Sequence, residues 1–257
     1  MTSTDLRTRT DLAVEAARKA GDLANDIFHS TFDVEVKADQ SPVTVADKKA
    51  EQLIRELVGK HFPADGFLGE EFGDQPGTSG FRWVIDPIDG TKSFIRKLPL
   101  WGTLVGLEYR GDPVAGAVYV PGMHQLFHAS RGNGAYRDGH RIHVSTIDTL
   151  TDSLLCYSSI SWFRKNGREA AFLDLAAKTD RQRGYGDFLG FLFVAQGSAE
   201  LMIDHGVHPW DVVALVPIVE EAGGVMTAWD NTRTTQRPDV IASNGRLHAE
   251  ALRVLNR

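Results

Sequence analysis

The sequence has little of what marks several common classes of protein. Its single cysteine, Cys156, cannot form an internal disulfide, so we expect a reducing compartment, the cytoplasm. It has no basic tract, and its 28 Lys and Arg are fewer than its 34 Asp and Glu, for a net charge of −6. This balance argues against a nucleic-acid partner. No apolar run approaches the ~18 residues that span a membrane, so we expect no membrane partner either.

Patterns of other enzyme classes are also missing. The sequence offers no Ser-His-Asp arrangement and no Walker-type glycine loop. His205 and His208 lack the partner spacing of a zinc site. There is no internal repeat, linker or low-complexity segment. What remains is a chain of 257 residues, 42% hydrophobic, which suits one domain or two fused subdomains.

The hydrophobic pattern changes character between the two halves of the chain. Apolar residues at helical spacing predict a helix over residues 9–30, and strands and turns fill residues 100–145. The second half alternates strands and helices, including one helix over residues 209–224 that ends at paired glycines. We expect a layered α+β fold. The expected parts are an N-terminal α+β subdomain over 1–147 and a C-terminal α/β subdomain over 148–257.

Three local signals set boundaries within this pattern. Thr44 and Asp47, three residues apart, resemble a capping box, which predicts the start of a second helix. Pro87 has no amide N–H, so we expect the strand over residues 81–86 to stop before it. Asp138-Gly139 is a dipeptide typical of a hairpin turn.

The stretch "IDPIDGT" places two carboxylates close together. Asp86 and Asp89 would aim at one point together with the Ile88 carbonyl, while the N–H groups of Gly90 and Thr91 begin a helical turn suited to an anion. Carboxylates beside an anion site require cations between them, and hard oxygen ligands favour Mg²⁺. The same pattern is also typical of ordinary turn and helix-cap aspartates.

Two further acidic elements join this stretch. Glu70 and Glu71 are adjacent, so on a strand they would face opposite sides, and at most one would point with the aspartates. Asp211 stands at the start of an apolar helix after Pro209 and Trp210. Taken alone, Asp211 is better explained as an ordinary acidic residue that complements the helix dipole.

Taken together, these motifs resemble those of the inositol monophosphatase superfamily. The matching stretches are "SPVTVADKKAE", "GEE", "WVIDPIDGTKSF", "VAQGSAEL" and "HPWDVVALVPIVEEAGG". The resemblance implies an αβαβα sandwich of the inositol monophosphatase and fructose-1,6-bisphosphatase type. It also implies a Mg²⁺-dependent, often Li⁺-sensitive phosphomonoesterase, commonly a homodimer, that acts on a small phosphorylated metabolite.

The resemblance also implies roles for individual residues. Two Mg²⁺ ions ~3.5–4 Å apart would neutralise the phosphate and activate water, with a weaker third ion near the outer carboxylate Glu71. The first ion's ligands would be Glu70, Asp86 and the Ile88 carbonyl; the second's would be Asp86, Asp89 and Asp211. Glu70, Thr91 and Asp47 would be the catalytic residues, with Thr91 and its acidic partner Asp47 orienting the attacking water; Gly90 and Thr91 would cradle the phosphate.

The substrate is indicated by softer signals. "SSISWF" and "YGDF" are most similar to bacterial histidinol-phosphate phosphatases of this superfamily. Asp187 and Asp204 would face the ammonium and imidazole of histidinol phosphate, Arg183 its phosphate, and Asp211 would also contact substrate. A structural ion-pair or cap role for Arg183, Asp187 and Asp204 stays open. So do two other functions: an inositol-1-phosphate or broad sugar-phosphate phosphatase, and an RNA- or transcription-associated binding protein.

Overall fold

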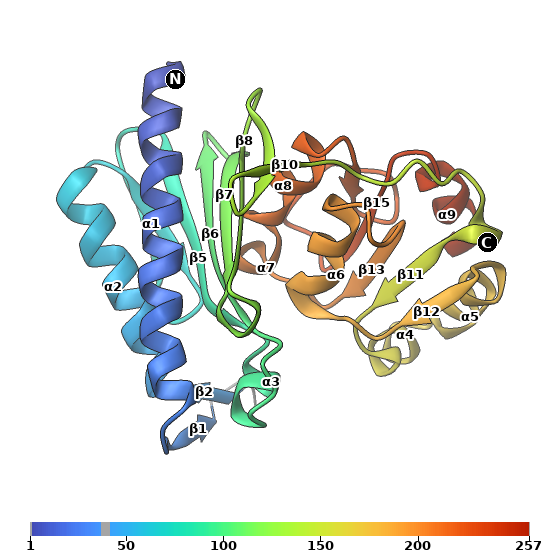
Figure 1. Cartoon of the computed structure of the whole chain (residues 1–257), viewed down its shortest axis with the longest axis horizontal. Coiled ribbons are helices and arrows are strands. Elements are labelled where there is room, and N and C mark those ends of the chain that lie inside the picture. Colours follow the sequence, from blue (N-terminus) through green and yellow to red (C-terminus); the bar gives the residue numbers. More distant parts are fainter. Residues whose placement is uncertain (1, 37–41, 257) are drawn as a thin grey trace.

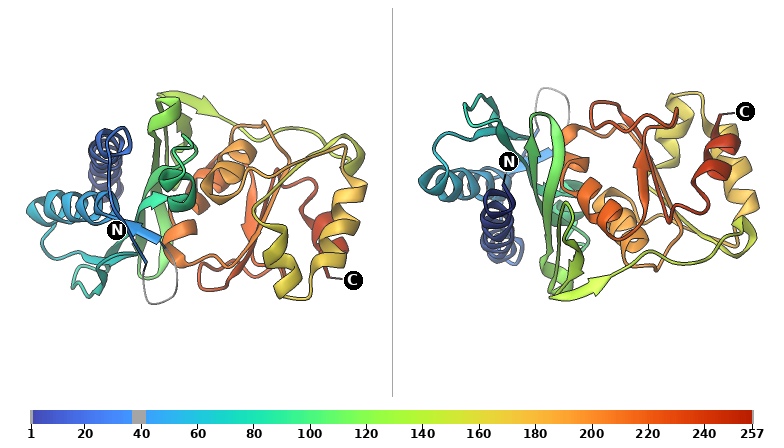
Figure 2. Two further views of the ribbon diagram at one scale, coloured as in Figure 1. Left: turned by 90° about the horizontal axis from the view of Figure 1, so that it is seen from below. Right: turned by 90° about the horizontal axis from the view of Figure 1, so that it is seen from above.

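The computed structural model describes residues 2–36 and 42–256, and they form alternating layers of helix and sheet (Figure 1). Helices α1 (Ser3–Phe28) and α2 (Val45–His61) cover the outer face of the first sheet. Helices α6 (Asp187–Ala195), α7 (Pro209–Val212) and α8 (Leu215–Glu221) lie between the two sheets. Helices α4 (Ile160–Lys165), α5 (Glu169–Lys178) and α9 (His248–Leu255) cover the second sheet, as both views of Figure 2 show. The predicted αβαβα order is confirmed.

The first sheet has the strand order β10-β9-β8-β7-β6-β5-β3-β4, and only its β3–β5 pair is parallel. Its central strands are long and buried because their residues are apolar on both faces, with helices on each side. The strands are β3 (Gly66–Gly69), β4 (Gly73–Gln75), β5 (Phe81–Asp89), β6 (Gly102–Tyr109), β7 (Asp112–Val120), β8 (Gln125–Ser130), β9 (Gly134–Arg137) and β10 (His140–Ile142).

The second sheet has the order β12-β11-β13-β15-β14 and mixes parallel with antiparallel pairs. Its strands are β11 (Leu154–Tyr157), β12 (Arg181–Arg183), β13 (Leu201–His205), β14 (Val225–Thr227) and β15 (Asp239–Ser243). A small hairpin joins β1 (Val34–Val36) and β2 (Pro42–Thr44), and the short segments are α3 (Thr91–Ile95), η1 (Pro121–Met123) and η2 (Leu150–Asp152). No helix among the described residues is both long and apolar enough to cross a membrane.

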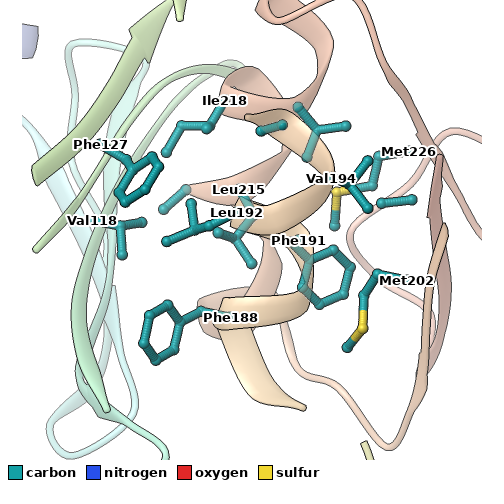
Figure 3. Close-up of a cluster of buried hydrophobic side chains, with 14 of the residues drawn as sticks. Val118, Phe127, Phe188, Phe191, Leu192, Val194, Met202, Leu215, Ile218 and Met226 are labelled. Carbon is teal, nitrogen blue, oxygen red and sulfur yellow. The ribbon is translucent and has the colours of Figure 1, made fainter. Parts of the chain in front are cut away.

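One hydrophobic core joins the two sheets through the middle helical layer (Figure 3). Val118 and Phe127 of the first sheet meet Leu192 of α6 and Leu215 of α8, and Met202 of the second sheet closes the other side. Burying each such side chain stabilises the fold by about 1.5–3 kcal/mol. The boundary at residues 147 and 148 falls between β10 and η2, and the two-subdomain division remains a prediction because this core spans both parts.

The expectation that Pro87 ends its strand is wrong. Strand β5 runs through Pro87 to Asp89, with a bulge in which Asp86 pairs with Leu104 and Asp89 with Gly102. A bulge tolerates proline because the residue there need not donate to the ladder. The Pro87 carbonyl instead accepts a 2.8 Å hydrogen bond from the Thr103 hydroxyl.

The helix boundaries were partly correct. The Thr44–Asp47 capping box is confirmed at the start of α2. The first helix begins at Ser3 rather than residue 9, because Thr2 and Asp5 form an earlier capping box. The expected single helix over 209–224 is two helices, broken at residues 213–214, because Pro217 has no N–H for the carbonyl four residues earlier.

Candidate active site

The acidic residues come from the ends of three elements. Asp86 and Asp89 lie in the bulged end of β5, and Asp211 lies in the first turn of α7, which packs against β5. Glu70 lies in the turn after β3. The strand position that the sequence analysis considered for Glu70 and Glu71 is therefore wrong. The Glu70 N–H donates to the Ile85 carbonyl at 3.2 Å, which ties this turn to β5.

Asp86 and Asp89 are both buried, and their carboxylates are close enough for their charges to interact. Asp86 accepts the N–H of Ile88 at 3.0 Å, and Asp89 accepts the N–H of Phe188 at 3.1 Å. Burial raises the pKa of Asp86 well above its usual range, and the charges of Glu70, Asp89 and Asp211 add to the effect. Burial likewise raises the pKa of Asp89, with Asp187 and Asp211 as the next causes. These carboxylates therefore repel each other strongly when ionised.

Asp211 and Asp47 complete the acidic group. Asp211 accepts the N–H of His208 at 2.7 Å, and burial raises its pKa to about 7. Asp47 is buried, and one of its oxygens accepts the N–H and hydroxyl of Thr44 at 2.8 and 2.7 Å. Its other oxygen, Oδ1, is buried without a hydrogen-bond partner among the described residues. Burial raises the pKa of Asp47 to about 6, and the charge of Glu70 contributes.

This donor set fits hard divalent cations. Several buried carboxylates with raised pKa values, one of them with an orphaned buried oxygen, are costly unless cations neutralise them. Among the described residues, no three His, Cys, Asp or Glu side chains already converge as ligands around one point. Asp86, Asp89 and Asp211 each engage a backbone N–H through one oxygen and have a second oxygen to offer. The metal is therefore indicated by the chemistry of the donor atoms and not by a preformed coordination geometry.

The predicted phosphate cradle begins α3. Gly90 caps this helix at φ +89°, a left-handed conformation that glycine adopts without strain. A Cβ there would lie 2.9 Å from the Leu100 carbonyl oxygen and 3.4 Å from Asp187 Oδ2. The Thr91 hydroxyl donates to the Ile88 carbonyl at 3.0 Å. Thr91 is thus paired with a predicted metal ligand, and Thr44 is the residue that bonds Asp47.

A cavity of about 130 Å³ extends from two of these carboxylates toward the second sheet. Asp204 of β13 is buried there, where it accepts the Ser158 hydroxyl and, at 2.6 Å, the His205 N–H. Burial raises its pKa to about 7. The cavity is lined by Asp89, Ser158, Trp162, Asp187, Phe191, Asp204, His205, Gly206, Val207 and Asp211. The structure therefore joins the predicted substrate residues Asp187 and Asp204 to the predicted metal ligands Asp89 and Asp211.

Asp187 has an unusual backbone. It begins α6 at φ +53°, a left-handed conformation that costs a non-glycine residue energy and that often marks functional sites. Burial by surrounding protein atoms raises its pKa, and the Lys92 ammonium opposes this. The side chain still reaches solvent at the mouth of the cavity. The structure thus holds a carboxylate in a strained position facing the site.

Two predicted residues lie elsewhere, and two cavity residues were missed. Arg183 is exposed on the edge strand β12, where it bonds the Gln182 carbonyl at 2.8 Å, and it does not line the cavity. Glu71 is half-buried in the turn after β3. Both roles remain predictions. Ser158 and Trp162 line the cavity without having been singled out; the segment "SSISWF" was the signal that contained them.

Comparison with known structures defines the class first. A crystal structure of extragenic suppressor protein suhB from Bartonella henselae matches with a TM-score of 0.92 and 29% identity, over 97% of this chain and 99% of that one. The chain belongs to the inositol monophosphatase family, whose family model matches residues 5–257. Its family and its relatives indicate a phosphoric monoester hydrolase. The predicted fold, family and enzyme class are confirmed.

Relatives in this family narrow the similarity further. The chain is 43% identical to a histidinol-phosphatase from Streptomyces coelicolor, over 87% of each protein. It is 38% identical to a histidinol-phosphatase from Mycobacterium tuberculosis, over 95% of this chain and 96% of that protein. Enzymes of the family are generally metal-dependent and bind phosphorylated substrates.

Proposed function

We propose that this protein is a Mg²⁺-dependent phosphomonoesterase that hydrolyses L-histidinol phosphate to histidinol and phosphate in histidine biosynthesis. One observation carries the choice of substrate: the cavity that starts at Asp89 and Asp211 continues to two further carboxylates, Asp187 and Asp204. A role as metal ligands would account for Asp89 and Asp211 but not for Asp187 and Asp204. The additional pair suits a cationic leaving group, and similarity to the histidinol-phosphatases supports the same choice.

Two Mg²⁺ ions would be held by the carboxylates of β5, the β3 turn and α7. The assigned ligands are Glu70, Asp86 and the Ile88 carbonyl for one ion, Asp86, Asp89 and Asp211 for the other, with Glu71 near a weaker third. When bound, these ions supply charge neutralisation of the phosphate and a lowered pKa of water. The raised pKa values of Asp86, Asp89 and Asp211 would fall in the presence of such positive charge.

The remaining groups hold water and phosphate. The Thr91 hydroxyl donates its hydrogen bond to the Ile88 carbonyl, so its oxygen lone pairs are available to accept a hydrogen bond from a water molecule and orient it. Asp47, with its unpaired Oδ1, and Glu70 form the acidic side of this catalytic group. The N–H groups of Gly90 and Thr91 at the start of α3 would bind phosphate oxygens.

Substrate choice follows from charge. Histidinol phosphate carries an ammonium and an imidazole beyond its phosphate, and Asp187 and Asp204 would pair with them. Inositol carries only hydroxyl groups there and would supply neither carboxylate with a positively charged partner. We also assign Asp211 a substrate contact, because it lines this cavity. Arg183 stays a proposed phosphate contact, although it does not line the cavity.

A matched substrate panel tests the proposal. Histidinol phosphate, inositol 1-phosphate and fructose 1,6-bisphosphate are compared at saturating Mg²⁺, with kcat/KM as the readout. We expect histidinol phosphate to exceed both others by at least about tenfold, the value of one charge-assisted hydrogen bond. Tenfold or greater preference for inositol or sugar phosphate would overturn the substrate. It would then support the alternative that the family description itself favours.

Three further properties belong to this proposal. We expect a homodimer, which size-exclusion chromatography with light scattering would reveal. We place the enzyme in the cytoplasm, where its one thiol, Cys156, stays reduced; burial raises the pKa of that thiol to about 12. A role in RNA or transcription would be supported if the inactive variant Asp86→Asn bound RNA in a salt-sensitive way. We expect no such binding, because the protein has a net charge of −6.

A further inference from the structure

A buried glutamate stands one helical turn beyond Asp47. Glu51 lies in α2 and is completely shielded from solvent. Its Oε2 accepts the N–H of Glu71 at 2.8 Å, and its Oε1 accepts the N–H of Phe72 at 3.3 Å. Residues four apart share a helix face, so α2 presents Asp47 and Glu51 to the same side. One carboxylate goes to the acidic site and the other to the turn that carries Glu70.

Arg55, a further turn along α2, completes this contact. Its Nε donates to Glu51 Oε1 at 2.8 Å, and its Nη2 donates to the Gly73 carbonyl at 2.6 Å. The pair therefore binds two N–H groups and one carbonyl of the chain over residues 71–73. A completely buried carboxylate with a charged partner and backbone donors is held in one orientation.

The glycine before Glu70 shows how closely the carboxylate packs. A Cβ on Gly69 would lie 1.9 Å from Glu51 Oε1, so no side chain fits there while Glu51 keeps its place. On the other side, the Glu70 N–H is tied to the Ile85 carbonyl of β5 at 3.2 Å. The backbone of Glu70 is thus fixed between β5 and the Glu51 carboxylate.

We propose that Glu51, braced by Arg55, is a positioning residue that sets the direction of Glu70 as a metal ligand. This inference rests on the proposed role of Glu70. A carboxylate here satisfies the donors of a tight turn, and an apolar side chain in its place would remove the acceptor of two backbone N–H groups. Residues that orient ligands in this indirect way typically change metal affinity about 10–100-fold when lost.

The test measures metal binding without substrate. Mn²⁺ is titrated into metal-free protein and free Mn²⁺ is followed by electron paramagnetic resonance, for the wild type and for Glu51→Gln, Arg55→Gln, Glu56→Gln and Glu70→Gln. We expect Glu51→Gln to weaken the tighter Mn²⁺ site about tenfold. Arg55→Gln should weaken it roughly threefold, because the brace is lost but the Glu51 carboxylate remains. Glu56→Gln, the same substitution on the exposed face of α2, should change nothing.

The outcomes separate this inference from the proposed function. If Glu70→Gln weakens Mn²⁺ binding but neither Glu51→Gln nor Arg55→Gln does, the positioning role is wrong and the ligand assignment stands. If Glu70→Gln binds Mn²⁺ like the wild type, the ligand assignment fails and this inference fails with it. If Glu51 has only a structural role, Glu51→Gln will lower the melting temperature of the metal-free protein. Its Mn²⁺ affinity, measured below that melting temperature, will equal that of the wild type. If Glu51→Gln does not fold, Arg55→Gln decides alone, because its side chain is partly exposed.

Discussion

The two walls of the active site are built in different ways. On the side of the first sheet, the carboxylates of Asp86 and Asp89 are fixed by backbone N–H groups and by a bulge within one continuous strand. On the side of the second sheet, Asp204, Ser158 and Trp162 come from different segments of the chain, and the Ser158 hydroxyl donates to Asp204. The two carboxylates of the first wall come from one stretch of sequence, although the N–H that binds Asp89 belongs to Phe188 of α6, and the second wall is assembled by tertiary structure. The proposed chemistry therefore depends mainly on a motif, whereas the proposed substrate choice depends on tertiary packing.

Removing a metal ligand should have the largest effect and should lower kcat for every substrate. Asp86→Asn takes a shared ligand from the proposed site, so we expect kcat to fall on the order of a thousandfold, since metal assistance contributes several kcal/mol. The loss should be equal for histidinol phosphate and inositol 1-phosphate. Asp112→Asn, which affects only the two surface ion pairs of Asp112 with Arg131 and Arg233, is the control. Near-normal turnover of Asp86→Asn at saturating Mg²⁺ would remove the ligand assignment.

A change in the other wall should alter selectivity instead. Asp204→Asn removes a buried charge, so we expect kcat/KM for histidinol phosphate to fall about 10–100-fold, the value of a hydrogen bond to a charged group. Turnover of inositol 1-phosphate should stay within about threefold. The neutral amide keeps the Ser158 contact, which makes it a conservative change. Equal losses on both substrates would show that the two walls are not separable.

The acidity of the site should make metal-free stability depend on pH. Asp47, Asp204 and Asp211 have folded pKa values of about 6, 7 and 7, raised by burial from 3.8. Their stabilising contribution is present below about pH 4 and is lost as the pH rises through 6 to 7, a change on the order of a few kcal/mol for each group. Melting in EDTA should therefore occur at lower temperature at pH 8 than at pH 5. Mg²⁺ needs ionised carboxylates, so the stabilisation it adds should grow over the same range. The same dependence of melting temperature on pH in EDTA and in Mg²⁺ would contradict this prediction.

The smallest effect compares one motif in two places. Thr44→Ala and Thr2→Ala each remove a helix N-cap, which costs about 1 kcal/mol. Thr44 also bonds the buried Asp47, whereas Thr2 is exposed. We expect both to lower the melting temperature by a few degrees, and only Thr44→Ala to lower kcat. If Thr2→Ala lowers kcat as much, Asp47 has no special dependence on its cap.

The sequence predicted the parts of the molecule that depend on neighbours along the chain. The Thr44–Asp47 box, the Asp138-Gly139 turn and the αβαβα order follow from local pattern or family resemblance, and the structure has each of them. The path of β5 through Pro87 was missed because a bulge depends on the partner strand, which spacing does not show. The break near Pro217 was missed because an apolar pattern continues across it.

The site divides in the same way. Glu70, Asp86, Asp89 and Asp211 were named from three motifs, and their mutual repulsion in the structure supports treating them as one group. Trp162 and Glu51 lie within quoted motifs, "SSISWF" and "SPVTVADKKAE", but neither residue was given a role from the sequence. Their significance depends on a cavity wall and on two N–H groups about twenty residues away. Only the folded chain brings those partners together.

One peptide unit connects the two walls. Asp187 faces the cavity, and the next N–H along the chain, that of Phe188, donates to the carboxylate of Asp89. A substrate that draws on Asp187 therefore acts on Asp89 through a single hydrogen bond. By thermodynamic reciprocity, whatever substrate binding does to the affinity of this end of the site for its ion, the ion must do equally to substrate. At the proposed site, the affinity for the substrate and the affinity for the ion would then depend on each other.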